Sequence, residues 1–419
     1  MKILVCNAGS SSLKFSLFEA EGELLLAEGG IDWTTKPTRL VFRRTGHQEI
    51  REELKLQKHS DAAARILNAL QAGPSAPLHV LGELQAVGHR VVHGGERYTA
   101  AVRITPEVKR VIGELAELAP LHNPVSLAGI TAVEQVLPGI PQVAVFDTAF
   151  HATLSEAART YPVPRKWTRE WGMRRYGFHG LSHSYCAGRA AEMVSRRNLR
   201  LIIAHLGNGA SVSAVHNGMC VDTSMGFTPL EGLMMGTRSG TVDPGMLVYL
   251  LRQKGLDVNE LDHALNYESG LLGVSGVSSD MRQVLSELAG NPNARLAVEV
   301  YVHRIRQTVG AMAATLGGVD ALVFTAGVGE HAPEIRKRVC ENLNYLGLEL
   351  DRTANETCQP DVDVALPASA ARILVIATRE DLTIMRETRQ LVGSLISQPH
   401  GNEHVRLPQY NNRRKEIDK

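Results

Sequence analysis

Residues 2 to 18, KILVCNAGSSSLKFSLF, decide the fold class, because the same arrangement occurs a second time in the chain. An apolar run leads into the polar segment Asn7 to Ser12, and apolar side chains then alternate with polar ones. This pattern predicts a strand, a turn and a second strand, which together form a β-hairpin. Residues 200 to 218, RLIIAHLGNGASVSAVHNG, repeat it around the turn Gly207 to Ser211. The chain is therefore predicted to begin the same kind of unit twice.

Another type of element recurs late in each half of the chain. QVAVFDTAFH at 142 to 151 and DALVFTAGVGE at 320 to 330 are both apolar runs that open into a polar turn. Helices are predicted at about 293 to 316 and at 380 to 397. The first has apolar residues at roughly helical spacing, namely Leu296, Val300, Ile305, Val309 and Met312. Two similar α/β halves are the simplest interpretation.

Size and charge agree with two domains and limit the partners. A chain of 419 residues with 44% hydrophobic content is long enough for two cores. Lys and Arg total 45 and Asp and Glu 44, for a net charge of +1. No overall field would attract nucleic acid or an anionic membrane. Any anion site must therefore be local.

Cysteine usage and hydropathy predict a cytoplasmic protein. The five cysteines are scattered, odd in number and without CxxC spacing, which favours reduced thiols. The apolar run at the N-terminus is too short for a signal peptide, and no run has membrane-spanning length. The segment 398 to 419 is polar and is expected to add no core.

Three glycine-rich turns, at 7 to 12, 207 to 211 and 326 to 330, are candidate phosphate sites. Each exposes backbone N–H groups where a strand ends. A single such turn is more often just a tight bend that needs positive φ. Three of them in a duplicated arrangement favour phosphate binding. None matches the P-loop or the dinucleotide fingerprint, so a different nucleotide fold is expected.

Several charged residues stand beside glycines or at the ends of apolar runs. Arg238 lies among small residues in the loop-rich segment 220 to 244, where its guanidinium could project into a cleft or form a surface ion pair. Arg90 and His179 both precede glycines, and His179 could equally be a packed core residue. Asp147 and Glu380 follow apolar runs, a position where an acid often caps the next helix.

The longer motifs resemble those of the acetokinase family, in the superfamily of acetate and sugar kinases, Hsp70 and actin. The resemblance runs from Met1 to about Thr388 and rests on NAGSSSLKF (7 to 15), GHRVVHGGE (88 to 96), DTAFH (147 to 151), YGFHG (176 to 180), HLGNGAS (205 to 211), DTSMGFTPLEGLMMGTRSG (222 to 240), SGLLGVSG (269 to 276) and FTAGVGE (324 to 330).

By this resemblance the fold is a duplicated ribonuclease-H-like, actin-like α/β fold with a central nucleotide cleft. Residues 1–150 plus about 381–397 would form the N-terminal lobe, and 151–380 the C-terminal lobe, with 398–419 a polar tail. The implied reaction is reversible transfer of the γ-phosphoryl group of ATP to acetate, giving acetyl phosphate and ADP. The implied cofactor is Mg²⁺, or Mn²⁺, and the implied assembly is a homodimer.

The resemblance also assigns roles by position. Arg90 would hold the acetate carboxylate, and Arg238 would hold the phosphoryl group. His179 would donate a hydrogen bond to the transition state, and Asp147 would orient these groups. The metal would bind at Asn7 and Glu380, and the acetate methyl at Val92, Leu121, Phe178 and Pro229. The nucleotide would contact Ser10, Ser12, Lys14, His205, Leu206, Gly207, Asn208, Gly209, Asp280, Met281, Arg282, Ala326, Gly327, Val328, Gly329 and Glu330.

Three residues depart from the family pattern at the edges of this site. Leu181 stands where Thr is usual, and His331 and Arg379 stand where Asn is usual. The last two place nucleotide or metal affinity in question. None replaces a residue that is assigned a catalytic role.

The implied chemistry needs positive charge rather than a base. With a pKa near about 4.3, acetate is already an anion at neutral pH. The problem is to bring it up to a polyanionic triphosphate, which cations at the phosphoryl oxygens solve. An acid facing acetate would repel it, so Asp147 and Glu380 are interpreted as orienter and metal support.

Three alternatives stay open. A covalent phosphoenzyme on a carboxylate would also transfer phosphate. Propionate or butyrate could be the acceptor, because one methylene in an apolar pocket is worth only about 1 to 3 kcal/mol. A non-metabolic nucleotide-binding protein of the actin and Hsp70 type could use the same fold, although it would not need a small-carboxylate pocket.

Overall fold

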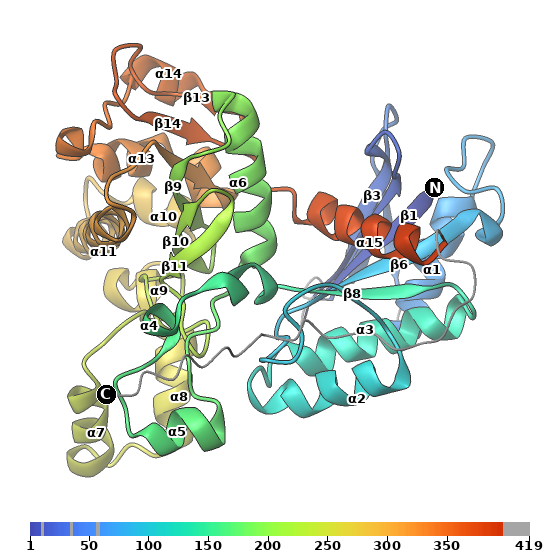
Figure 1. Cartoon of the computed structure of the whole chain (residues 1–419), viewed down its shortest axis with the longest axis horizontal. Helices are drawn as coiled ribbons and strands as arrows, with labels where there is room; N and C mark the ends of the chain where they lie inside the picture. The colour runs from blue at the N-terminus through green and yellow to red at the C-terminus, as the bar shows by residue number, and fades with distance from the viewer. Residues whose placement is uncertain (10–11, 34–36, 56–58, 397–419) are drawn as a thin grey trace, which may run out of the picture.

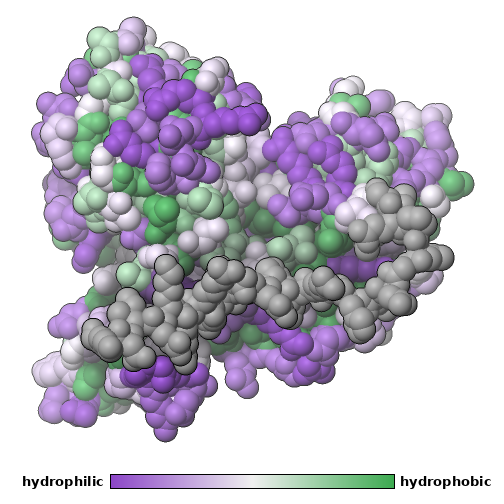
Figure 2. All heavy atoms as spheres, viewed as in Figure 1, coloured by the Kyte–Doolittle hydropathy of each residue, from purple (hydrophilic) through white to green (hydrophobic). Residues whose placement is uncertain are grey.

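The structure, a computed structural model, describes residues 1–9, 12–33, 37–55 and 59–396. Its two β-sheets lie in separate bodies joined near the middle of the molecule (Figure 1). Figure 2 shows a hollow between these bodies, with apolar residues toward its base. Ser10 and the tail 398 to 419, on both of which the sequence carries a prediction, lie outside the described residues.

The first sheet has the strand order β5-β4-β3-β2-β1-β6-β8-β7. Its strands are β1 (Lys2–Ala8), β2 (Ser12–Glu19), β3 (Leu24–Asp32), β4 (Thr38–Arg44), β5 (Ile50–Leu54), β6 (Leu84–Val91), β7 (Val102–Arg103) and β8 (Gln142–Phe146). The predicted hairpin is confirmed, since β1 pairs antiparallel with β2 and Asn7 lies opposite Lys14. Strand β6 is parallel to both β1 and β8.

The second sheet has the order β11-β10-β9-β12-β14-β13. Its strands are β9 (Arg200–Leu206), β10 (Ala210–His216), β11 (Met219–Thr223), β12 (Ala321–Thr325), β13 (Val362–Asp363) and β14 (Arg372–Val375). The second predicted hairpin is also confirmed, because β9 pairs antiparallel with β10. Strands β9, β12 and β14 run parallel. Three antiparallel strands followed by two parallel ones thus occur in both sheets.

Helices cover both faces of each sheet. The first sheet packs one face on α1 (His59–Gln71) and α3 (Asn123–Val136) and the other on α15 (Glu380–Ile396), and α2 (Pro106–Glu114) flanks α3. The second sheet packs on α6 (Gly180–Val194) and on the long α11 (Pro292–Leu316). Both predicted helices are confirmed within a residue or so.

The remaining helices surround the second sheet or connect elements. They are α4 (Glu156–Arg159), α5 (Arg165–Trp171), α7 (Pro244–Gln253), α8 (Val258–Tyr267), α9 (Gly270–Ser275), α10 (Met281–Ser286), α12 (Ala326–His331), α13 (Pro333–Cys340) and α14 (Arg352–Thr357). Short 3₁₀ turns occur at Leu81–Glu83, Leu115–Glu117, Ala149–Thr153 and Asn344–Leu346. Over the described ranges, no helix is both long and apolar enough to cross a membrane.

The chain crosses from the second body to the first just before helix α15. The chain leaves β14, passes Thr378 and Arg379, and enters a helix that lies over β1 and β6 (Figure 1). Its residues Leu382, Ile384 and Met385 share a core with the first sheet. Helix α15 follows the second sheet directly in sequence. It nevertheless packs on the first sheet, because burial of these apolar side chains there is favourable.

Two local predictions are wrong. Leu296 in α11 is 50% exposed, because the buried face of that helix passes through Ala297, Val298 and Tyr301 instead. Residues 326 to 330 form the short helix α12 rather than a turn. The prediction of a loop-rich segment at 220 to 244 is confirmed, because residues 224 to 243 contain neither helix nor strand and only the ends lie in β11 and α7.

Candidate active site

Strands β6 and β8 of the first sheet end side by side and bring Arg90 to Asp147. The Nε of Arg90 lies 3.1 Å from Oδ2 of Asp147, and Nη2 of Arg90 bonds to the same oxygen. Asp147 is almost fully buried. Glu380, the first residue of α15, places a carboxylate oxygen 4.0 Å from the same Nε. The guanidinium is thus held between two acids.

Burial and charge act in opposite directions on this pair. Burial raises the pKa of Asp147, and the Glu380 charge adds to the rise while Arg90 opposes it. Burial lowers the pKa of Arg90, but the Asp147 and Glu380 charges outweigh it, so the net shift is upward. Arg90 therefore stays charged and oriented, with further N–H groups available to an anion.

Arg238 has a different environment. Its Nη1 donates to the carbonyl of Pro229 at 3.3 Å and lies 3.9 Å from Sδ of Met235. Among the described residues no carboxylate lies within ion-pair distance of it. Burial lowers its pKa. A half-buried guanidinium without a counter-charge is costly, so an anion bound here would supply the missing partner, and the surface ion-pair alternative is not seen among the described residues.

His179 sits at the start of α6 in an uncommon backbone conformation. Its φ is +59°, in the left-handed region that β-carbon-bearing residues seldom adopt. The next residue, Gly180, donates its N–H to the carbonyl of Asp147 at 2.9 Å, which ties this turn to the first sheet. The strain is concentrated where the two bodies meet, as is common at functional sites.

The His179 ring stacks on that of His205, with centroids 4.1 Å apart. A β-carbon on Gly209 would lie 3.3 Å from Nε2 of His179 and 3.6 Å from Nη1 of Arg238. The imidazole and the free guanidinium therefore meet over the β9–β10 turn. Burial, and then the nearby histidine and arginine charges, lower the pKa of His179 well below its usual value. The ring is neutral at neutral pH and acts as a hydrogen-bonding group.

The four residues predicted to hold a methyl group have different environments. Val92 and Phe178 are buried in one core cluster. The backbone carbonyl of Pro229 accepts the hydrogen bond from Arg238. Leu121 is 52% exposed and is not part of that cluster. The structure thus brings three of the four to the site.

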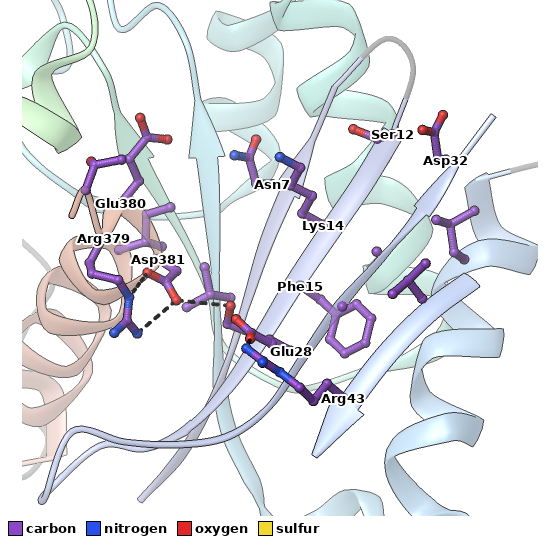
Figure 3. Close-up of a pocket in the computed structure, with 18 of the residues that line it drawn as sticks. Asn7, Ser12, Lys14, Phe15, Glu28, Asp32, Arg43, Arg379, Glu380 and Asp381 are labelled. Atoms are coloured by element: carbon purple, nitrogen blue, oxygen red, sulfur yellow. Dashed lines mark hydrogen bonds and ion pairs between the residues drawn. The ribbon is translucent and has the colours of Figure 1, made fainter. Parts of the chain in front are cut away.

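A cavity of about 850 Å³ opens over the first sheet beside the β1–β2 turn. Figure 3 shows Asn7 and Lys14 next to one another on these strands, with Glu380 at the same edge of the cavity. Ser12 also lines it. An ammonium, an amide and a carboxylate at the end of a hairpin suit a phosphate chain with its counter-ion.

The metal prediction can be tested on donor chemistry. Within the described ranges, no group of three or more His, Cys, Asp or Glu side chains gathers to hold a metal ion. Asn7 and Glu380 offer one amide and one carboxylate oxygen at the cavity edge. Mg²⁺ commonly takes one or two protein oxygens and completes its shell with water and substrate phosphates. The residues present fit such a shared site.

The predicted nucleotide segment at 326 to 330 is held by its own residues. The Glu330 carboxylate accepts hydrogen bonds from the backbone N–H groups of Ala326 at 2.8 Å and Thr378 at 3.0 Å. The buried Arg336 donates to the carbonyls of Gly329 and Glu330 at 2.9 and 2.8 Å. Glu330 therefore orients the short helix α12 through its side chain.

The other predicted nucleotide residues line the second sheet and its neighbours. His205 and Leu206 end β9, and Gly207 to Gly209 form the turn. Gly236 donates to the carbonyl of Asn208 at 2.9 Å, which joins this turn to the Arg238 loop. Asp280 caps α10 and pairs with the exposed Arg282, while Met281 is buried.

The departures from the family pattern are accounted for by packing and pairing. Leu181 is buried in the core that α15 shares with the first sheet. His331 is exposed beside Glu330, with 3.9 Å between ring and carboxylate. Arg379 turns away from Glu380 to Asp381, with its Nε 3.0 Å from Oδ1 (Figure 3).

Sequence reasoning missed two histidines near this site, and it predicted Ser211 only as part of the phosphate turn 207 to 211. His183 and Ser211 form a hydrogen-bonded chain with His179, and His122 lies near both arginines, whose charges lower its pKa after burial does. The i,i+4 spacing of His179 and His183 at a helix start was the available signal. His122 follows the predicted Leu121 directly, which could also have drawn notice.

Comparison with known proteins adds the family. A model of the Acetokinase family matches residues 2–386. A Gloeobacter violaceus protein named acetate kinase is 50% identical over 402 residues, covering 93% of this chain and 99% of that protein. A Nostoc punctiforme protein of the same name is 50% identical over 404 residues, with 94% and 100% covered.

Comparison with solved structures gives the same family. The crystal structure of Porphyromonas gingivalis acetate kinase superposes with a TM-score of 0.87 at 42% identity, covering 93% of this chain and 99% of that one. A propionate kinase from Francisella tularensis gives 0.86 at 39% identity, with the same coverage. The fold prediction of a duplicated actin-like α/β architecture is confirmed.

Proposed function

The chain belongs to the acetokinase family, and from that premise we propose that it reversibly transfers the γ-phosphoryl group of ATP to acetate, giving acetyl phosphate and ADP. The observation that carries the proposal is the meeting of a half-buried, unpaired Arg238 with His179 over the glycine turn, in a molecule that also holds Arg90 beside Asp147. A nucleotide-binding protein without a small-carboxylate substrate would not need these cations.

The transfer is direct and in line. Acetate, already ionised, binds to Arg90, with its methyl group toward Val92, Phe178 and Pro229. Arg238 and the neutral His179 face the phosphoryl oxygens that gather charge in the transition state. A base is not required, since the nucleophile carries no proton to remove.

Asp147 is poorly suited to be a phosphoenzyme nucleophile. One of its carboxylate oxygens accepts two bonds from Arg90, and the residue is 1% exposed. It is better suited to orient Arg90, which supports direct transfer. Inversion at a chiral γ-phosphorus is expected, and retention would establish a covalent intermediate.

Mg²⁺, or Mn²⁺, would bind at Asn7 and Glu380 and neutralise phosphate charge. A Glu380→Gln variant is expected to need about tenfold more Mg²⁺ for half-maximal activity, because a charged ligand is lost. Glu299→Gln, on the exposed side of α11, is the matched control and should leave that concentration unchanged. An unchanged Mg²⁺ requirement in Glu380→Gln would remove this residue from the metal site.

A homodimer is proposed through helices α7 and α8. Every residue of these two helices is described, and none is buried. Exposed apolar side chains include Met246, Val248, Tyr249 and Tyr267. Such a surface favours association with a second copy. Light scattering should give twice the chain mass, and the double variant Val248→Glu/Tyr249→Glu should give the single mass. A single mass for the wild type would refute the dimer.

Two lobes are proposed to close over the substrates, namely residues 1–150 plus about 381–397, and 151–380. Closure would exclude water that could hydrolyse ATP. Small-angle scattering with and without ATP and acetate should show a smaller radius of gyration when both bind.

A cytoplasmic location is also proposed, and five unpaired cysteines, four of them buried, support it.

The activity itself is tested by trapping acetyl phosphate with hydroxylamine. The enzyme should form the hydroxamate from ATP and acetate, with kcat/KM higher for acetate than for propionate or butyrate. A higher value for propionate would change the acceptor, as in the Francisella tularensis relative. No hydroxamate with any of the three acids would overturn the proposed function.

A further inference from the structure

Behind His179, two buried side chains form a hydrogen-bonded chain that the reaction scheme above does not use. Nδ1 of His179 lies 2.9 Å from Oγ of Ser211, and the same oxygen lies 2.8 Å from Nε2 of His183. Ser211 and His183 are fully buried. His183 follows His179 by one turn of α6, and Ser211 lies on β10. The three groups therefore form one line from the interior toward the cleft.

Three proton arrangements of this chain are possible, because a neutral imidazole carries one N–H, whereas a hydroxyl carries one proton and two lone pairs. If Ser211 accepted from both rings, its own buried proton would have no acceptor among the described residues, so Ser211 donates to one ring and accepts from the other. If His183 donates from Nε2, Ser211 donates to Nδ1 of His179, and the proton of His179 sits on Nε2. In the reverse arrangement, Nε2 of His179 carries only a lone pair.

Two observations select the first arrangement. Nε2 of His179 and Nη1 of Arg238 both face Gly209 in the β9–β10 turn, where an anion needs donors and would be repelled by a lone pair. Nδ1 of His183 is buried without a hydrogen-bond partner among the described residues. An orphaned buried N–H is rarer in native proteins than an unsatisfied acceptor, so this nitrogen is the one without the proton.

We propose that His183 and Ser211 are positioning residues that hold His179 in its Nε2–H tautomer, so that it donates a hydrogen bond to the transferred phosphoryl group. The proposal rests on the proposed catalytic role of His179. The tautomer of an imidazole is set by the partner of its other nitrogen, and here that partner is a hydroxyl rather than a carboxylate. A hydroxyl relay keeps the ring neutral.

The neighbouring ring is held in the same way. Nδ1 of His205 lies 2.8 Å from Oγ of Ser182, which lies 2.8 Å from Oγ1 of Thr378. A β-carbon on Gly207 would lie 3.7 Å from Nε2 of His205. Both stacked imidazoles thus bond to a buried serine through Nδ1 and turn Nε2 toward the glycine turn. The repetition supports a built arrangement of two donors.

The test compares variants that keep or remove the donor to Ser211. Ser211→Ala breaks the relay and is expected to lower kcat about ten- to a hundredfold, as loss of a supporting hydrogen bond commonly does, with the KM values for ATP and acetate within about threefold. His183→Leu should behave like Ser211→Ala. His183→Gln places an amide N–H near the position of Nε2 and should retain at least about a third of the wild-type kcat.

A spectroscopic readout separates the relay from general damage to the site. Long-range ¹H–¹⁵N spectra of histidine-labelled enzyme, assigned with His179→Gln, should show the protonated nitrogen of His179 as Nε2 in the wild type. A protonated Nδ1 in the wild type, or wild-type kcat in Ser211→Ala, would overturn the relay alone. Wild-type kcat in His179→Ala would instead overturn the catalytic role on which the relay depends.

Discussion

The two sheets share an arrangement of three antiparallel and two parallel strands, yet their corresponding hairpins carry different chemistry. The β1–β2 hairpin brings Asn7 and Lys14 to a cavity beside Glu380. The β9–β10 hairpin brings glycines and Ser211 to a pair of neutral imidazoles. The first hairpin therefore supplies a formal charge through Lys14, whereas the second hairpin supplies neutral donors and backbone N–H groups. Duplication sets where groups meet, and side chains set what they do there.

The two arginines differ in whether the protein supplies a negative charge beside them. Arg90 extends from a strand and is balanced by Asp147, whereas Arg238 comes from the loop after β11 and lacks a carboxylate within the described part of the chain. Arg90 is already neutralised in part by the protein. Arg238 has no such partner, which agrees with its proposed role of facing the phosphoryl oxygens that gather charge.

The largest expected effect is on activity. Arg238→Ala and Arg90→Ala should each lower kcat/KM at least about a hundredfold, because each removes a major electrostatic stabiliser. Arg238→Ala should act mainly on kcat and Arg90→Ala also on the KM for acetate. Arg197→Ala, on an exposed turn, is the control. Near-normal steady-state kinetics in either variant would refute its assigned role.

The next largest effect is on the free energy of unfolding, which should differ between the variants of the two arginines. Arg90→Ala leaves the buried Asp147 without its partner and should lower the free energy of unfolding by about 2–4 kcal/mol. Arg238→Ala removes a cation that has no acidic partner and should lower it by less than about 0.5 kcal/mol. Urea unfolding measures both. Equal losses would show that the pairing difference has no energetic consequence.

Neutral imidazoles predict a particular pH dependence. Burial lowers the pKa of His205 to about 4, and that of His179 well below 6.5. Between about 6.5 and 4 the unfolded chain binds more protons than the folded one, so stability falls as pH falls through that window, by about 2 kcal/mol per such histidine at pH 5. Urea unfolding at pH 7 and 5 measures this loss.

The same shifts predict the pH profile of the reaction. Neither His179 nor His205 titrates between pH 6.5 and 8, so kcat should be flat over that range. An inflection in the plot of kcat against pH near 6.5 that disappears in His179→Gln would show that the His179 ring becomes charged during turnover. The second hairpin would then not act through neutral donors alone.

The smallest expected effect concerns the β9–β10 turn. A β-carbon in Gly209→Ala would lie 3.3 Å from Nε2 of His179, which must shift slightly. We expect kcat to fall about five- to tenfold with little change in stability. Gly188→Ala, in α6 with open space around it, should leave kcat unchanged and slightly stabilise the helix. Equal kcat values for the two variants would show that the turn tolerates a side chain.

Local sequence patterns determined most of the architecture. Both hairpins, α11 and α15 follow from alternation or helical spacing of apolar residues, which depend only on near neighbours. The motifs also identified the residues that gather near the cleft. The pattern failed for Leu296, since a helix that is apolar on several sides does not reveal which side the sheet will cover.

Tertiary structure alone decided how those residues are charged and paired. The sequence left Arg238 open between a cleft cation and a surface ion pair, and only the absence of a carboxylate near it among the described residues chose between them. The pairing of Arg90 with Asp147 and the hydroxyl between His179 and His183 join segments far apart in the chain. Such contacts depend on which strands end side by side, and local spacing does not encode that.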